Sequence, residues 1–272
     1  MKTQTKTARA QRNLFHRVLI VVCLACSFAG AASANNDVYR KAINSTTFIV
    51  TDVATGSGVL IDRQNGLVVT NHHVIEGSET VVVFFPVELQ DKLVQDKEYY
   101  INHIQQHGIK AKVVAADATR DIAILQLPMV PKHAVEISIG LPAEPGDMVH
   151  SIGNPGTSGA LWIYTNGYVR ANYYKRVDSN RMQVVESSSP VNPGDSGGPM
   201  LNDAGQLVGL TQSFMKNGRL VSNGVDISEI TWFVKKVERE QGLQVNSAGT
   251  PDQNASHNSA GQNLLSMLTS NK

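Results

Sequence analysis

One octapeptide decides how this sequence of 272 residues is interpreted: Asn192-Pro193-Gly194-Asp195-Ser196-Gly197-Gly198-Pro199. Ser196 stands beside glycine in a tight turn, which exposes its hydroxyl group and lets a carbonyl group approach closely. The backbone N–H groups of Gly194 and Ser196 can converge on the oxygen of an attacked carbonyl and form an oxyanion hole. A surface turn also needs Gly and Pro, so the octapeptide alone leaves both interpretations open. A nucleophilic serine requires a base and an orienting acid, which must come from elsewhere in the chain.

A histidine and an aspartate precede this serine, in the order His73, Asp121, Ser196. The segments around them, with two others, are Thr70-Asn71-His72-His73-Val74, Asp121-Ile122-Ala123-Ile124-Leu125, Gly153-Asn154-Pro155, Asn192–Pro199 and Gly205-Gln206-Leu207-Val208-Gly209. In this order they resemble the trypsin-like serine peptidases, and the HtrA/Deg branch most closely. The resemblance covers about residues 45–235, and five ordered matches are far more specific than one.

The resemblance implies a catalytic triad. Ser196 would be the nucleophile, His73 its general base, and Asp121 the acid that orients the imidazole. The backbone of Gly194, Asp195 and Ser196 would form the oxyanion hole. The sequence therefore predicts acyl transfer from a peptide to a serine and then to water.

Two choices within these segments have to be made. In the family pattern the base directly precedes a valine, which selects His73 rather than His72. We expect the two histidines to lie in a strand, where neighbouring side chains point to opposite faces, so that only one faces the serine. The pattern gives the role of the acid to Asp121, while Asp117 is expected to accept hydrogen bonds in the preceding turn.

Substrate preference follows more weakly from the resemblance. In trypsin-like enzymes the residue six positions before the nucleophile forms the floor of the primary pocket, and an acid there selects Lys or Arg. Pro190 holds that position here, so small or medium apolar residues are expected instead. The opposite wall is expected to include Asn223. An extended peptide is expected to pair with the strand edge formed by Thr211, Gln212, Ser213 and Phe214.

Asp195 departs from the asparagine that is usual in the HtrA branch. In digestive trypsin-like enzymes an acid at this position binds a newly cut N-terminus. The chain has no Arg/Lys-Ile-Val-Gly-Gly activation site. A local hydrogen-bonding role is therefore expected for Asp195.

The first 34 residues have the pattern of a signal peptide. They contain five basic residues and no acid, then an apolar run over Val18–Ala32 that is shorter than the roughly 20 residues of a membrane span. The sequence Ala32-Ser33-Ala34 predicts cleavage after Ala34, and hence a periplasmic or secreted protein; an uncleaved anchor stays open as an alternative. Both cysteines, Cys23 and Cys26, lie in this leader, so no disulfide is expected after cleavage.

Charge excludes some partners. Without the leader, 19 Lys and Arg stand against 23 Asp and Glu, a net charge of about −4. This argues against nucleic acid or an anionic membrane as a partner. His103 and His107 have the i, i+4 spacing of a metal pair, but no glutamate follows His103 as in zinc hydrolases, so no metal and no cofactor is expected.

Short strand patterns that end in one helix favour an all-β fold of two antiparallel β-barrels. The resemblance implies the same trypsin-like double barrel with six strands each, His73 and Asp121 in the first and Ser196 in the second. Ser228 is expected to cap the helix, which extends to Gln241. The expected strands are 46–53, 58–62, 67–70, 79–87, 109–115 and 121–127, then 147–152, 161–164, 167–174, 182–186, 207–214 and 220–227.

The protease domain is expected over 35–241, with the boundary between barrels near 128–145, where prolines gather. The polar segment 88–108 is expected to be a surface insertion with helical pieces. Residues 242–272 are polar and expected to be disordered. HtrA proteins usually carry PDZ domains at this end, and about 30 residues cannot hold one. Relatives in this branch are typically trimers, which implies a homo-oligomer.

The predicted function is that of an exported serine endopeptidase that cleaves unfolded or misfolded polypeptides. Two alternatives stay open. A catalytically inactive relative would keep the cleft as a peptide-binding or chaperone surface, although binding alone does not require His73, Asp121 and Ser196 together. An esterase would use the same triad, although the strand-to-helix elbow that carries the serine of such enzymes is not expected here.

Overall fold

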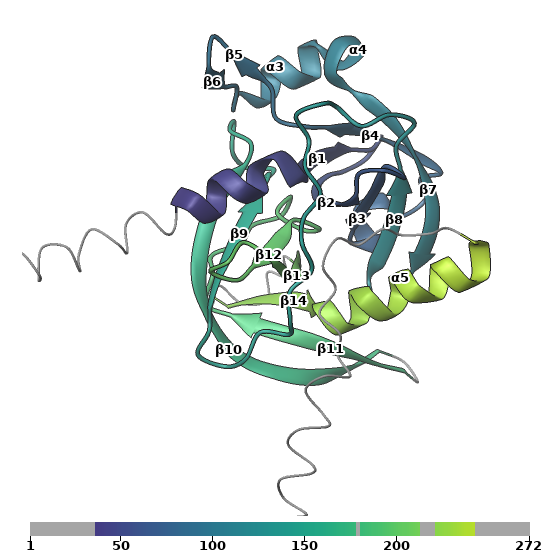
Figure 1. Cartoon of the computed structure of the whole chain (residues 1–272), viewed down its shortest axis with the longest axis vertical. Helices are drawn as coiled ribbons and strands as arrows, with labels where there is room; N and C mark the ends of the chain where they lie inside the picture. The colour runs from purple at the N-terminus through teal and green to yellow at the C-terminus, as the bar shows by residue number, and fades with distance from the viewer. Residues whose placement is uncertain (1–35, 178–179, 213–220, 243–272) are drawn as a thin grey trace, which may run out of the picture.

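The computed structural model describes residues 36–177, 180–212 and 221–242 (Figure 1). Residues 36–42 are helical and lead through a 3-10 turn, η1 (Ile43–Ser45), into the first sheet. No helix in the described part of the chain is long and apolar enough to span a membrane. The expected signal peptide, Ser213, Phe214 and the C-terminal tail lie outside the described residues.

The first barrel is formed by short apolar segments rich in β-branched residues, as expected. Its six antiparallel strands close in the order β1-β2-β3-β8-β7-β4. Every residue of β3 is buried, because one face points into the barrel and the other is covered by the rest of the fold. The strands are β1 (Thr46–Val50), β2 (Thr55–Asp62), β3 (Leu67–Thr70), β4 (Thr80–Phe84), β7 (Ile109–Asp117) and β8 (Ile122–Gln126).

The second barrel also closes with six antiparallel strands, in the order β10-β11-β14-β13-β12-β9. Its strands are β9 (Met148–Gly153), β10 (Ile163–Val177), β11 (Asn180–Ser187), β12 (Pro199–Leu201), β13 (Leu207–Gln212) and β14 (Ser222–Asp226). The expected double six-stranded barrel is therefore confirmed. The chain crosses from one barrel to the other after β8, where Ile137 bonds to Leu60 and Ser138 then bonds to Leu207.

Two details of the second barrel differ from the expectation. The strands expected at 161–164 and 167–174 form one long strand, β10, because Gly167 acts as a close-packing residue and not as a turn. A Cβ at Gly167 would collide with the backbone of Ser188 and Ser189. The short strand β12 was not expected, since its three residues follow directly on a glycine-rich turn and start with Pro199.

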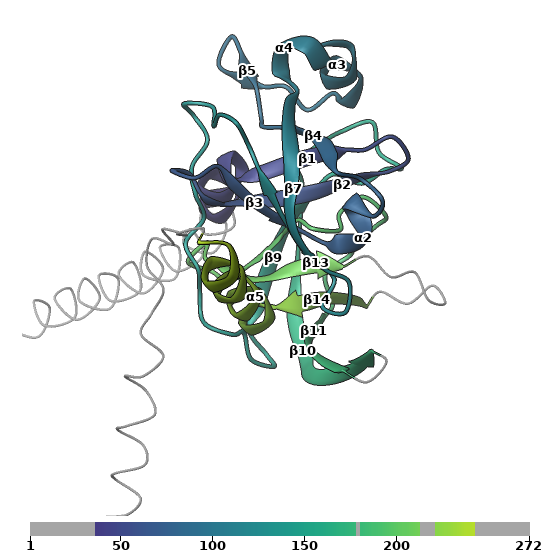
Figure 2. The same cartoon turned by 90° about the vertical axis from the view of Figure 1, so that its right-hand side faces the viewer.

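Helix α5 (Ile227–Gln241) lies against β11, β13 and β14 (Figure 2). It buries Ile230, Phe233 and Val237, as the spacing of these residues predicts. The expected cap was wrong by two residues. The carboxylate of Asp226, not the Ser228 hydroxyl, accepts the first free amide, since the Ser228 N–H donates to Asp226 Oδ1 at 2.8 Å.

The insertion between β4 and β7 sits on the first barrel, at the top of Figure 1. It consists of β5 (Glu88–Leu89), β6 (Lys92–Leu93), α3 (Lys97–Asn102) and α4 (Ile104–His107). The expected helical pieces are present, but the insertion is not confined to the surface. Tyr100 is fully buried and packs edge-on to Phe84 and Trp162, at centroid distances of 5.8 and 4.9 Å. The insertion thus shares the main core.

Candidate active site

His73 and Asp121 form a bonded pair at the end of the first barrel. His73 Nδ1 lies 2.8 and 3.0 Å from the two carboxylate oxygens of Asp121, and the His73 backbone N–H donates to Oδ1 at 2.9 Å. The pair stays accessible, with the His73 side chain 40% and the Asp121 side chain 15% exposed. Because Nδ1 faces the carboxylate, Nε2 is the nitrogen that can exchange a proton with another group.

The expectation that the two histidines lie in a strand was wrong. The strand β3 ends at Thr70, and the chain turns into one helical turn, α2 (His72–Ile75). Consecutive side chains on a helix point about 100° apart, which still gives the two histidines different directions. The turn also brings the His73 amide onto Asp121.

Asp121 is held in an unusual backbone conformation with φ of 54°. The Asn71 side-chain amide donates to the Asp121 carbonyl oxygen at 2.9 Å, and Gln212 Nε2 donates to Asp121 Oδ2 at 2.6 Å. Gln212 belongs to β13 of the second barrel, so this bond joins the two barrels at the carboxylate. Gln212 was expected in the substrate-binding strand; its side chain contacts Asp121, and its part in substrate binding stays a prediction.

The turn before Asp121 is fixed by Arg120. Asp117 accepts hydrogen bonds from the Arg120 amide and guanidinium at 3.0 and 3.1 Å, so its expected role in the turn is confirmed. Arg120 Nε also donates to Glu229 of α5 at 2.8 Å, and its guanidinium lies 3.8 Å from the ring centre of Trp232. The C-terminal helix therefore anchors the turn that carries Asp121.

Ser196 lies in the turn between β11 and β12, against the first barrel. Its carbonyl oxygen accepts the Ser57 amide at 2.8 Å. The next residue, Gly197, has φ of 84° and leaves no room for a side chain; a Cβ there would lie 3.1 Å from the Asn71 nitrogen. Asn71 is two residues before His73. The backbone contact thus brings the serine turn against the segment that carries the histidine.

The three residues expected to form the oxyanion hole play different parts. The Asp195 amide donates to the Asn192 carbonyl at 3.0 Å, so it is already used. Gly194 has φ of 103°, and its carbonyl oxygen accepts the Ser57 hydroxyl at 2.9 Å. Among the residues that the structure describes, none accepts a hydrogen bond from the Gly194 amide. The Asp195 amide is therefore not a candidate, and the oxyanion hole formed by the amides of Gly194 and Ser196 stays a prediction.

Ser57 is a functional residue that the sequence reasoning missed. Its hydroxyl donates to the Gly194 carbonyl and accepts from the Asn154 amide and from Asn154 Nδ2, at 3.1 and 3.0 Å. Asn154 also donates to the Thr47 carbonyl at 3.0 Å and accepts from the Trp162 amide at 2.9 Å. A serine between two glycines, just before the apolar run Val59–Ile61, was the available signal.

Replacing Ser57 with alanine is expected to lower the free energy of unfolding by about 1–3 kcal/mol, because buried partners at Asn154 and Gly194 lose their hydrogen bond. Chemical denaturation measures this change. The matched control is Ser138→Ala, at an exposed serine of the connector, which should change the value by less than about 0.5 kcal/mol. Equal effects of the two variants would contradict the role given to Ser57.

The Asp195 carboxylate is buried, with 8% of the residue exposed. Its Oδ2 accepts the Asn192 amide at 2.7 Å, so the expected local hydrogen-bonding role is confirmed. Burial raises the pKa of Asp195 to about 6, although the Asn192 amide and the charge of Lys97 oppose the shift. The carboxyl group packs against Gly153, which has no side chain to displace it.

The raised pKa of Asp195 predicts a pH-dependent stability. Between the ordinary pKa of 3.8 and about 6 the folded protein binds this proton more tightly than the unfolded chain, so stability falls as pH rises through that window and levels off above it. Asp195→Asn should remove this pH-dependent contribution to the free energy of unfolding, about 2–3 kcal/mol. Unfolding curves at pH 4 and pH 7 measure it. The exposed Asp52→Asn serves as control, and an unchanged pH slope in Asp195→Asn would refute the prediction.

The other expected substrate-binding residues are placed as follows. Pro190 is exposed, six residues before Ser196. Asn223 is paired with Gln212 across β13 and β14. Both backbone groups of Thr211 are bonded, to Gly198 and Gly197, at 2.9 Å each. Its main chain is therefore not available to pair with a peptide.

No group of three metal-ligating side chains occurs within the described ranges. His103 and His107 instead stack on the ring of Tyr99, with centroid distances of 4.3 and 5.5 Å. His107 Nε2 also bonds to the Tyr99 hydroxyl at 3.0 Å. These contacts account for both histidines.

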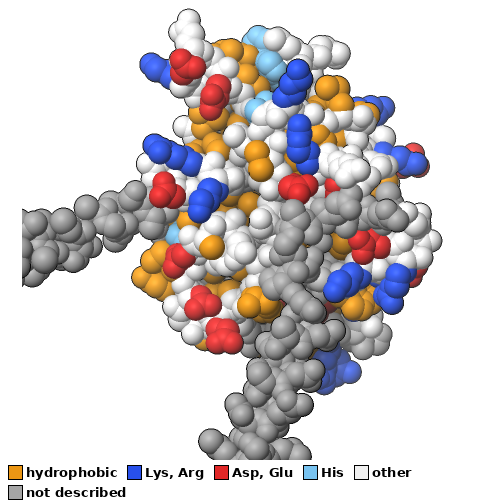
Figure 3. Space-filling model, viewed as in Figure 1, with side chains coloured by type: hydrophobic (Ala, Val, Ile, Leu, Met, Phe, Trp, Pro, Cys, Tyr) orange, Lys and Arg blue, Asp and Glu red, His pale blue; other side chains and the backbone are white. Residues whose placement is uncertain are grey.

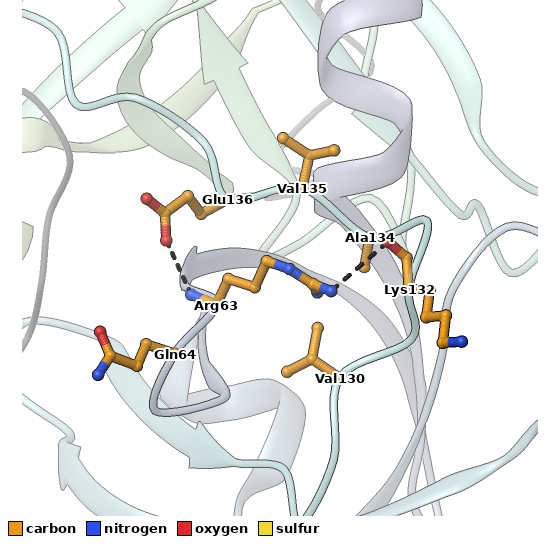
Figure 4. A pocket seen from close by; sticks show the side chains of 7 residues that line it. All are labelled: Arg63, Gln64, Val130, Lys132, Ala134, Val135 and Glu136. Atoms are coloured by element: carbon orange, nitrogen blue, oxygen red, sulfur yellow. Dashed lines mark hydrogen bonds between the residues drawn. The ribbon is translucent and has the colours of Figure 1, made fainter.

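A hollow of about 750 Å³ lies away from these residues, between the β2–β3 turn and the connector (Figure 4). The Arg63 guanidinium turns to the Pro131 carbonyl at 3.0 Å, and the Arg63 amide donates to Glu136 at 2.9 Å. None of the predicted catalytic residues lines the hollow. On the face shown in Figure 3, acidic and basic side chains are interspersed and form no basic stripe.

The letters Gly194–Gly198 do fit the G-x-S-x-G spacing of esterases, so spacing alone does not exclude that class. The elbow of those enzymes joins a strand to a helix. Here the turn with Ser196 is followed by the strand β12, not by a helix. The local fold is therefore different from that of the esterase elbow.

Comparison with known proteins agrees with this arrangement. The serine endoprotease DegS of Salmonella typhimurium is 32% identical over 201 residues, which cover 69% of this chain and 48% of DegS. The serine protease Do-like HtrA of Lactobacillus helveticus is 31% identical over 160 residues, covering 57% of this chain and 34% of that protein. The chain thus spans about half or less of the length of these relatives.

Solved structures share the fold. A protease from M. tuberculosis in its active form gives a TM-score of 0.61 at 23% identity and covers 81% of this chain and 89% of that one. The serine endoprotease from Yersinia pestis gives 0.59 at 23% identity, over 76% of this chain and 67% of that one. The sequence model of the trypsin-like peptidase domain matches residues 56–210. The chain belongs to the trypsin-like peptidases and resembles the HtrA/Deg proteins among them.

Proposed function

We propose that this chain is a serine endopeptidase that hydrolyses polypeptides through an acyl-enzyme on Ser196. The observation that carries the proposal is the bonded pair of His73 and Asp121 beside the serine turn. A Cβ added at Gly197, next to Ser196, would lie 3.1 Å from the backbone nitrogen of Asn71, which is two residues before His73. The serine endoproteases among its relatives support the same reaction. Because the chain spans only part of their length, the activity needs its own test.

In the proposed mechanism His73 Nε2 takes the proton of the Ser196 hydroxyl as Oγ bonds to the peptide carbonyl carbon. Asp121 holds the imidazole in the tautomer with hydrogen on Nδ1 and stabilises the imidazolium that forms. The amides of Gly194 and Ser196 receive the oxyanion, each contributing about 3 kcal/mol to lowering the barrier. The C–N bond then breaks as His73 returns the proton to the leaving amine.

The second half of the reaction repeats these roles with water. His73 removes a proton from a water molecule that attacks the acyl ester of Ser196. The ester C–O bond breaks, the product leaves as a carboxylic acid, and the proton on His73 restores the serine hydroxyl. The accessible side chain of His73 supports entry of water at this step.

We further infer an exported enzyme that acts on unfolded polypeptides. The basic and apolar leader up to Ala34 supports export, as does a relative described as a probable periplasmic serine endoprotease. The lack of an acid at Pro190 supports cleavage after small or medium apolar residues rather than after Lys or Arg.

Mass spectrometry of the products from a peptide library tests the activity and the preference together. We expect cuts after small or medium apolar residues and none that require Lys or Arg. A parallel assay with an unfolded protein and a simple ester separates a peptidase from an esterase. A protein that cleaves the ester but no peptide, or that binds peptides without cutting them, would overturn the proposal.

A further inference from the structure

The insertion reaches the second barrel beside the serine turn. Asp96 forms an isolated β-bridge with Ala160, and the Lys97 amide donates to the Gly159 carbonyl at 2.9 Å. The Leu161 amide donates to Gln95 at 2.8 Å. Residues 95–97 are thus paired, main chain to main chain, with the loop that connects β9 and β10.

The side chain of Lys97 extends this contact toward the active site. Its Nζ donates to the carbonyl oxygens of Pro155 and Gly156, at 2.9 and 3.4 Å. Burial lowers the pKa of Lys97, and the nearby Asp195 carboxylate opposes that shift. Lys97 therefore donates two hydrogen bonds to the 155–156 segment, in electrostatic range of the buried acid next to Ser196.

The 155–156 segment in turn holds the peptide unit that precedes Gly194. The Gly156 amide donates to the Pro193 carbonyl at 2.7 Å. In a trans peptide the C=O and the following N–H point in opposite directions. Binding of the Pro193 oxygen to Gly156 therefore fixes the Gly194 N–H on the opposite side, away from this segment. A Cβ at Gly194 would also collide with the Gly156 nitrogen, so the packing is close.

We propose that Lys97 is a positioning residue for the oxyanion hole: it holds the 155–156 segment, which sets the orientation of the Gly194 amide. This inference rests on the proposed peptidase activity, since it assigns a part in that reaction. The insertion would then support the active site in addition to contributing Tyr100 to the hydrophobic core. Lys97 contacts no substrate and acts only through Pro155 and Gly156.

The test compares Lys97→Met with Lys92→Met, which removes an exposed lysine of the same insertion. In Lys97→Met we expect kcat for a peptide substrate to fall by at least about tenfold, within the roughly 100–1000-fold that loss of an oxyanion donor costs. KM should stay within about twofold, because the affected amide acts mainly in the transition state. Lys97→Arg should restore part of kcat, and Lys92→Met should match the native protein.

A second readout does not depend on activity. Hydrogen exchange of peptides covering 154–158 and 192–198 should be faster in Lys97→Met than in the native protein and unchanged in Lys92→Met. Lys97→Gln gives the same comparison if the methionine variant does not fold. An active native protein whose Lys97 variants keep kcat within twofold would overturn the inference. If the native protein cleaves nothing, the peptidase proposal fails. Unchanged hydrogen exchange in Lys97→Met would, independently of activity, overturn the claim that Lys97 holds the 155–156 segment in place.

Discussion

Replacing Ser196 with alanine should lower kcat for peptide hydrolysis by a factor on the order of 10⁵–10⁶. The variant keeps the backbone bonds of residue 196, since its carbonyl still accepts the Ser57 amide, but has no oxygen to attack the carbonyl carbon. Labelling with a fluorophosphonate probe should disappear with the same substitution. Turnover of an unfolded protein and probe incorporation, measured on the same preparations, check both effects.

The matched control is Ser78→Ala, in the loop that follows α2. It should label and turn over like the native protein. If Ser196→Ala still incorporates the probe at the native level, another residue is the nucleophile. If neither the native protein nor the control incorporates the probe, the chain is a binding relative and not a peptidase.

Replacing Asp121 with asparagine should lower kcat by a factor on the order of 10⁴. The carboxylate accepts three groups in this structure: the His73 amide, His73 Nδ1 and Gln212 Nε2. An asparagine that keeps its oxygen on the His73 amide turns its NH₂ group toward Nδ1. The imidazole then carries its proton on Nε2 and cannot accept one from Ser196.

The control is Asp117→Asn, in the same loop, whose carboxylate bonds to Arg120 and not to the histidine. It should change kcat by only a few-fold. Imidazole ¹⁵N chemical shifts would report the tautomer of His73 directly. An Asp121→Asn variant with native kcat, or with hydrogen still on Nδ1, would remove Asp121 from the mechanism.

The sequence predicted the parts of this protein that depend on local pattern. The ordered motifs identified His73, Asp121 and Ser196 as candidates, and the short strand patterns, together with the family resemblance, predicted both barrels. The prediction of two separate strands over 161–164 and 167–174 was wrong, because the backbone beside Gly167 passes too close for a side chain and β10 continues through it. The predicted helix cap was also wrong, since Asp226 and Ser228 lie two residues apart and either can cap a helix.

Residues that act over long sequence distances could not be predicted from one sequence. Ser57 contacts Gly194 across 137 positions, and Gln212 contacts Asp121 across 91. Neither residue type is diagnostic by itself: serine and glutamine are common in strands that face polar surroundings. Lys97 lies in a polar insertion that was predicted to be a surface insertion with helical pieces, with no sign of a role near Ser196. Their roles depend on which strands become neighbours when the barrels close. The local sequence pattern does not specify the register of those strands.

The bond between Arg120 and Glu229 has a consequence for the stage of folding at which the candidate site is completed. Glu229 is 109 residues further along the chain than Arg120, and it also accepts the Gln183 amide at 2.8 Å. A nascent polypeptide that has not yet emerged as far as α5 lacks this anchor. The turn that carries Asp121 therefore reaches its final arrangement only after nearly the whole described chain has been made, so this corner of the candidate site is completed late in folding.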